Sequence, residues 1–139
     1  MVRSDLSTLN AVLIVKTDDA TITIDNYDPD SDIFGLNDRE TADGEVTPDG
    51  YFNGWCKRTP IETNFTCTGA SKGGKQLQGL LNAQASGKLL NVTIVVQNLD
   101  ETTTYGPGVL LSAKPAAHLG NQKVQPVTFN FKFGDLTSA

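Results

Sequence analysis

Alternation of apolar and polar side chains at every second residue is the feature that most constrains the fold of this chain. It runs through residues 61–68 (IETNFTCT), 89–99 (LLNVTIVVQNL) and 124–133 (VQPVTFNFKF). Because successive side chains of a strand point to opposite faces, this period predicts strands with one buried and one solvated face. The predicted solvated faces carry Glu62, Asn64, Thr66 and Thr68 in the first segment, and Asn91, Thr93 and Gln97 in the second.

Further strands are predicted before and between these segments. Residues 9–15 are mostly apolar and residues 21–24 alternate, so the two are expected to form a hairpin that turns at Asp18 and Asp19. Residues 102–113 form a strand that Gly106, Pro107 and Gly108 interrupt, which is typical of a bulge or a tight corner. The polar tail, residues 134–139, is expected to fray.

One amphipathic helix lies among the strands. Ser71 is suited to cap its start, Leu77, Leu80 and Leu81 recur at helical spacing, and Gly87 is suited to end it. Strands outnumber helices and do not alternate with them. The prediction is therefore a mainly β protein with one α-helix, an antiparallel β-sandwich or barrel flanked by that helix, as a single domain over residues 1–139.

Residues 26–53 break the strand pattern and are acidic. Between positions 17 and 50 there are eleven Asp and Glu residues against a single basic residue. We predict a long loop, either a solvated insertion or a segment that orders only against a neighbouring subunit. In the second case Ile33, Phe34 and Leu36 would anchor it, since apolar side chains in an acidic loop need a place to pack. Lys72 and Lys75 would then face the loop across the subunit boundary.

The acidic segment contains an incomplete calcium-binding pattern. Asp28, Asp30 and Asp32 occupy the first three ligand positions of an EF-hand loop. The positions that require Gly and Glu hold Ile33 and Arg39 instead, so a solvated loop is the favoured interpretation. We expect no metal.

No catalytic motif accompanies these elements. Residues 71–75 (SKGGK) lack the spacing of a phosphate-binding loop, and His118 has no nucleophile in a recognised arrangement with it. The prediction is a protein that is not an enzyme and needs no cofactor.

Composition excludes other classes of protein. The apolar runs are far shorter than the roughly 20 residues of a membrane span, and the N-terminus lacks an apolar secretion signal. Two cysteines, Cys56 and Cys67, are expected to be reduced thiols in a protein made in the cytoplasm. With a net charge of −5 and no basic stripe, tight binding to nucleic acid is not expected.

The order of elements carries a family resemblance. A polar-alternating strand (IETNFTCTG) precedes an amphipathic helix (KGGKQLQGLLNAQ), followed by GKLLNVTIVVQNL, YGPGVLLSAKPAAHLG and a closing VQPVTFNFKF. This layout resembles the tail tube proteins of contractile-tailed bacteriophages, which are related in architecture to the tubes of type VI secretion systems. The resemblance covers most of the chain and rests on layout rather than on signature residues.

The resemblance implies a structural virion protein, made in the host cytoplasm, that forms homo-hexameric rings. The rings would stack into a tube inside a sheath, with baseplate and tail terminator proteins as further partners. DNA would pass through the lumen without specific binding, and no membrane would be involved. The lumen would be neutral to negative and lined by the solvated strand faces, namely Glu62, Asn64, Thr66, Thr68, Asn91, Thr93 and Gln97.

Other interpretations remain open. Within the same class, the protein could be a baseplate tube-initiator or a secretion tube. In a different class, it could be a monomeric decorating or adhesive β-domain whose acidic segment binds a ligand.

Overall fold

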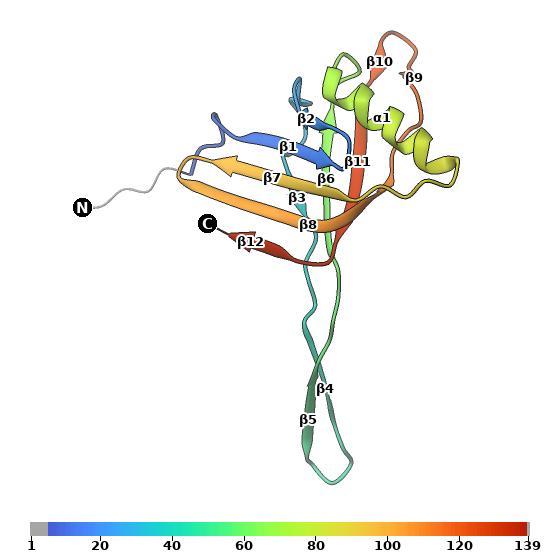
Figure 1. Cartoon of the computed structure of the whole chain (residues 1–139). Coiled ribbons are helices and arrows are strands. Elements are labelled where there is room, and N and C mark those ends of the chain that lie inside the picture. The colour runs from blue at the N-terminus through green and yellow to red at the C-terminus, as the bar shows by residue number, and fades with distance from the viewer. Residues whose placement is uncertain (1–5, 139) are drawn as a thin grey trace, which may run out of the picture.

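A computed structural model of the chain describes residues 6–138. Residues 1–5, part of the segment tested for a secretion signal, and Ala139 of the polar tail lie outside this range. The strands form an eight-stranded sheet. Figure 1 shows the helix at the upper end of this sheet and a long hairpin at its lower end. The order in the sheet is β2 (Thr21–Thr23), β1 (Val12–Thr17), β7 (Val92–Asn98), β8 (Glu101–Ser112), β11 (Val127–Phe133), β6 (Ile61–Cys67) and β3 (Gly35–Leu36), with β12 (Leu136–Ser138) paired to β8.

The sheet folds back on itself around one apolar core. The strands β1, β7 and the first part of β8 make one layer, and β6, β11 and the last part of β8 make the other. Every strand pair is antiparallel, so the predicted mainly β fold with one helix is confirmed. The largest side chains that both layers bury completely are Phe65, Phe129, Phe131, Phe133, Leu13 and Ile94.

The strand β8 crosses from one layer to the other at the predicted bulge. Val92 pairs with Gly108 and Ile94 with Tyr105, so β8 holds one more residue than β7 across this step. A Cβ atom at position 108 would clash with the ring of Phe133. Glycine is therefore needed where the two layers approach each other.

The helix α1 (Lys72–Ala85) forms where the sequence predicts it. Ser71 caps its start by accepting a hydrogen bond from the Gly74 N–H at 3.0 Å, Leu77 is completely buried, and Gly87 follows its end with a φ of 101°. The cap is anchored to the end of β2, because the Ser71 hydroxyl also donates to a carboxylate oxygen of Asp25 at 2.9 Å.

This anchor makes the stability of the fold depend on pH. The Gly73 N–H and the Ser71 hydroxyl both donate to the Asp25 carboxylate and lower its pKa. A lowered pKa contributes stability that is present above the ordinary aspartate range and is lost as the pH falls through the folded-state value. Asp25→Asn should therefore be less stable than the wild type at pH 7, with the difference shrinking towards pH 3 in denaturant titrations. If the two proteins differed in free energy of unfolding by the same amount at pH 7 and at pH 3, this account would be contradicted.

The structure corrects the prediction for residues 26–53. This segment is not only loop: it contains β3, and its second half forms a hairpin of β4 (Ala42–Val46) and β5 (Phe52–Cys56). Every residue of β4 and β5 is exposed. Period-two alternation reflects burial of one face, so a hairpin that buries neither face within its own chain lacks that signal.

Three strand boundaries also differ. The first strand begins at Val12 rather than at residue 9. Pro126, which has no N–H to donate, divides the predicted last strand into β10 (Val124–Gln125), paired with β9 (His118–Leu119), and β11. The tail predicted to fray instead forms β12, which pairs with β8 through its backbone and needs no apolar pattern.

Candidate assembly surfaces

The outer face of the β6–β11 layer is polar and balanced in charge. Glu62, Asn64 and Thr66 lie opposite Lys132, Asn130 and Thr128 of β11. The hydroxyls of Thr66 and Thr128 are 2.8 Å apart, and the Lys132 ammonium lies 3.7 Å from Glu62. Short hydroxyl and amide groups with one internal ion pair make a hydrated surface without excess charge.

The other predicted solvated residues lie on the opposite side of the molecule. Thr93 and Gln97 are on the outer face of β7, and Asn91 immediately precedes that strand. Because the inner faces of both layers share one core, their outer faces point away from each other. The seven residues therefore do not form one surface, and Thr68 lies beyond β6 in the turn before α1. The face of β6 is instead completed by Thr128, Asn130 and Lys132, which the alternation of residues 127–133 could have revealed.

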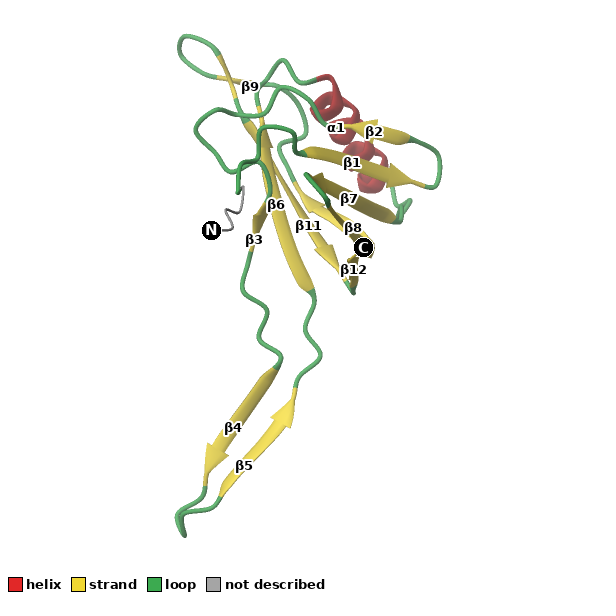
Figure 2. Cartoon of the chain, turned by 90° about the vertical axis from the view of Figure 1, so that its left-hand side faces the viewer, coloured by secondary structure: helices red, strands yellow, loops and turns green. Residues whose placement is uncertain are grey.

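The arm, residues 42–56, projects from the body as a two-stranded ribbon (Figure 2). Its tip exposes 70% of Val46, 69% of Tyr51 and 71% of Phe52. The Phe52 ring folds over the glycine pair Gly44 and Gly54 on one side of the ribbon, and a Cβ at position 44 would clash with it. The arm is therefore an ordered ribbon with exposed apolar side chains.

The charge of the arm is negative. Its acids are Asp43, Glu45 and Asp49, and it contains no Lys or Arg. Lys57, just beyond the arm, pairs with Glu40 at 3.3 Å and with Asp43 at 3.8 Å. Trp55 is 47% exposed on the arm and lies outside the core.

The helix α1 and the β9–β10 hairpin lie at the end of the molecule opposite the arm (Figures 1 and 2), and this end carries lysines without ion-pair partners among the described residues. We define the lysine end as three segments: the start of α1, the connection from β8 to β9, and the β9–β10 hairpin. Its lysines are Lys72, Lys75, Lys114 and Lys123. None of these four lysines forms an ion pair within residues 6–138. Two of them occupy the first turn of α1, where the helix dipole disfavours positive charge and where none of the helix's own residues is acidic.

A groove of about 540 Å³ opens at this end. Its walls include Lys75, Lys123 and Val124, together with Asp28 and Asp30 of the segment that follows β2. The β9–β10 hairpin beside it exposes 76% of Leu119 and 41% of Val124, which pair across the two strands. Apolar and basic groups are thus combined at one site.

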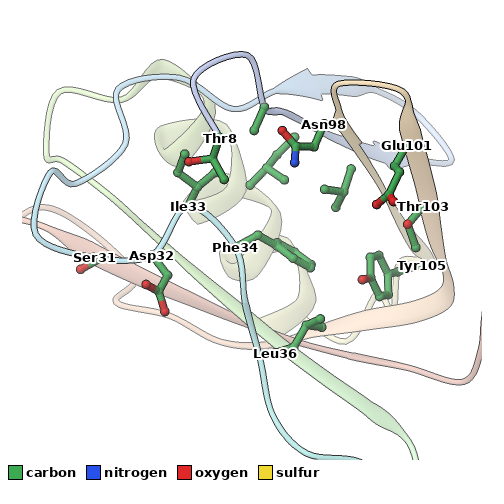
Figure 3. Close-up of a pocket in the computed structure, with 13 residues that line it drawn as sticks. Thr8, Ser31, Asp32, Ile33, Phe34, Leu36, Asn98, Glu101, Thr103 and Tyr105 are labelled. Carbon is green, nitrogen blue, oxygen red and sulfur yellow. The ribbon is translucent and has the colours of Figure 1, made fainter. Parts of the chain in front are cut away.

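The segment with Ile33 and Phe34 closes the side of the core (Figure 3). Both side chains are half-buried and pack against the core of their own chain, and the Phe34 ring lies 5.3 Å from that of Tyr105. Ile33 and Phe34 therefore find packing partners within their own chain. Leu36 stays exposed beside a cavity of about 530 Å³, and a role at a subunit boundary remains a prediction for all three.

No three His, Cys, Asp or Glu side chains of residues 6–138 are placed to hold a metal, and Asp28 accepts a hydrogen bond from Ser31 at 2.6 Å. Burial raises the pKa of the Cys67 thiol to about 11, which leaves it unreactive, while Cys56 is a free, exposed thiol. The single described helix is too short and too polar to span a membrane.

Solved structures with a similar fold include chains from the anti-feeding prophage and from an extracellular contractile injection system. A chain of the anti-feeding prophage baseplate, in a six-fold symmetrised cryo-EM structure, aligns with a TM-score of 0.63 and 9% identity over 100% of this chain and 97% of that one. A chain of the sheath/tube terminator of an extracellular contractile injection system aligns with a TM-score of 0.63 and 8% identity, covering 100% and 99%. A chain of the sheath–tube complex of that system aligns with a TM-score of 0.50 and 10% identity, covering 91% and 87%. At these identities the similarity shows the fold.

Sequence comparison supplies the family. No curated protein matches the chain significantly. The family model described as tail fiber protein gp32 matches residues 5–137, nearly the whole chain. The chain therefore belongs to the tail fiber protein gp32 family and is a phage tail-related protein.

Proposed function

We propose that the protein is a structural subunit of a phage tail tube, assembled as hexameric rings that stack into a conduit for DNA. The observation that carries the proposal is the polar, charge-balanced outer face of the β6–β11 layer. In the tube this face lines the channel, with Glu62, Asn64 and Thr66 beside Thr128, Asn130 and Lys132. DNA passes this face without binding to it tightly, because tight binding to phosphates requires excess positive charge.

The outer face of the β1–β7 layer is less suited to a water-filled channel. It includes the apolar side chains Val12, Ile14 and Val95 among its polar ones, and all three are half-buried. We assign this face, with Thr93 and Gln97, to contacts with neighbouring proteins. The sheath is the partner that a tube meets on its outer surface, and baseplate and terminator proteins meet its two ends.

The arm supports self-assembly. Its side chains lie outside the apolar core of its own chain. Its exposed aromatic side chains are of the kind enriched in protein interfaces. A second copy of the chain is the partner that a ring or tube supplies at every position.

Sedimentation velocity and negative-stain microscopy test the proposal. As the concentration is raised through the micromolar range, the protein is expected to pass from monomer to rings and rods with a central channel. A monomer that persists at every concentration, temperature and salt condition would contradict tube formation and favour a decorating or adhesive domain.

A ring at the end of the tube, as initiator or terminator, is the second candidate. The alignments to the baseplate and terminator chains score higher than the alignment to the sheath–tube complex, 0.63 against 0.50. Microscopy separates the two candidates, because a tube subunit forms rods of many rings, whereas an end subunit stops at single rings.

A further inference from the structure

We infer that the arm of one copy docks into the groove of the lysine end of another copy, so that the contact is head-to-tail. This inference rests on the proposed function and specifies the surfaces that join the subunits. The two surfaces lie at opposite ends of the molecule, with the arm below the sheet and the lysine end above it (Figure 1). A contact between two different patches can continue from copy to copy, as stacking requires.

Charge complementarity is the first argument. The arm has three acids and no Lys or Arg, whereas neither α1 nor the β9–β10 hairpin contains an acid. The lysines of that end have no ion-pair partner within the described residues, and Glu45 of the arm has none either. The groove is also lined by Asp28 and Asp30, so the acids of the arm are expected beside Lys75 and Lys123 and away from these two carboxylates.

The unfavourable position of two lysines in the first turn of α1 is the second argument. Positive charge in the first turn of a helix opposes the helix dipole, and α1 has Lys72 and Lys75 there against the single carboxylate of Asp25, which accepts from the Gly73 N–H. Residues that break a local rule are expected where they serve a function. A docked carboxylate near Lys72 and Lys75 would offset the positive charge that the single carboxylate of Asp25 leaves.

Apolar complementarity is the third argument. Phe52 and Val46 lie opposite each other on one side of the arm, and Leu119 and Val124 lie opposite each other on the β9–β10 hairpin. All four are exposed in the isolated chain. Docking of the ribbon between the walls of the groove would cover both apolar pairs on one side. It would bring Glu45, which alternates with Val46 and points to the other side of the ribbon, towards the lysines.

Charge reversal tests the contact. Glu45→Lys on the arm and the pair Lys75→Glu with Lys123→Glu at the lysine end are each expected to raise the concentration needed for assembly roughly tenfold or more, since like charges would face each other. Combining all three substitutions should restore assembly to near the wild-type value. Lys88→Glu is the matched control: this lysine is exposed, pairs only with Asp19 and lies outside the proposed contact. Circular dichroism should show all variants folded.

A disulfide trap tests the geometry directly. In a Cys56→Ser background, one protein carries Glu45→Cys and another carries Lys123→Cys. The mixture is expected to form a cross-linked heterodimer under mild oxidation, and neither protein alone should cross-link to itself. Glu45→Cys cross-linking to itself would indicate an arm-to-arm contact and overturn the inference.

The possible failures are distinguishable. If the wild type assembles while the charge reversals and the cysteine pair have no effect, the docking site is wrong and the tail tube proposal stands. If the wild type forms neither rings nor rods, the proposed function fails as well.

Discussion

Removing the arm is expected to give a folded monomer that no longer assembles. Ala42 and Cys56 are directly paired at the base of the ribbon, so residues 43–55 can be replaced by Asn-Gly, which favours a two-residue hairpin turn. The removed residues contribute no side chain to the core. The melting temperature should therefore change by only a few degrees, whereas rings and rods should disappear from electron micrographs at concentrations at which the wild type assembles.

The control for this deletion keeps the ribbon and changes its surface. Phe52→Ser removes the exposed ring that covers Gly44 and Gly54 but leaves the cross-strand pairing. It should weaken assembly less than the deletion does. If the shortened protein assembles as well as the wild type, the arm is not an assembly element and the account of its exposed aromatic residues is wrong.

Truncating the aromatic core is expected to have the largest effect on stability. Phe131 is completely buried, its ring stacks 5.5 Å from Phe65 and 6.0 Å from Phe133, and it lies where both layers meet. Phe131→Ala should cost about 3–5 kcal/mol, because the lost transfer free energy is added to the cost of a cavity. The free energy of unfolding of a native protein is typically about 5–15 kcal/mol, so this loss would leave the fold only marginally stable.

Asn130, the next residue in β11, is the matched control. Its side chain points to the opposite face and donates to the Ser112 hydroxyl at 3.1 Å. Asn130→Ala should cost no more than about 1 kcal/mol, the typical value of one exposed hydrogen bond. Urea titrations of both variants measure the difference. If both substitutions lowered the free energy of unfolding by the same amount, the two faces of β11 would not differ in burial.

The parts of the fold that could be predicted are those in which burial leaves a pattern. In β6, Phe65 and Cys67 are buried while Asn64 and Thr66 face outwards, as the alternation requires. Ser71, Leu77 and Gly87 mark the helix through capping, packing and a positive φ, which depend on local chemistry.

The parts that could not be predicted depend on contacts that leave no such pattern. The arm is exposed on both faces, and β12 is held by backbone pairing with β8. Alternation also identifies the two sides of a strand without identifying the layer it joins. For this reason the alternation predicts one surface for Asn64 and Thr93, although they lie on opposite sides of the core.

A reconstruction of the assembled particle by electron cryomicroscopy tests the central claim most directly. The account predicts six-fold rings in which Asn64, Thr66, Thr128 and Asn130 line the channel and each arm reaches the lysine end of another copy. Rings whose channel is lined by the β1–β7 face, or particles built without arm contacts, would contradict it.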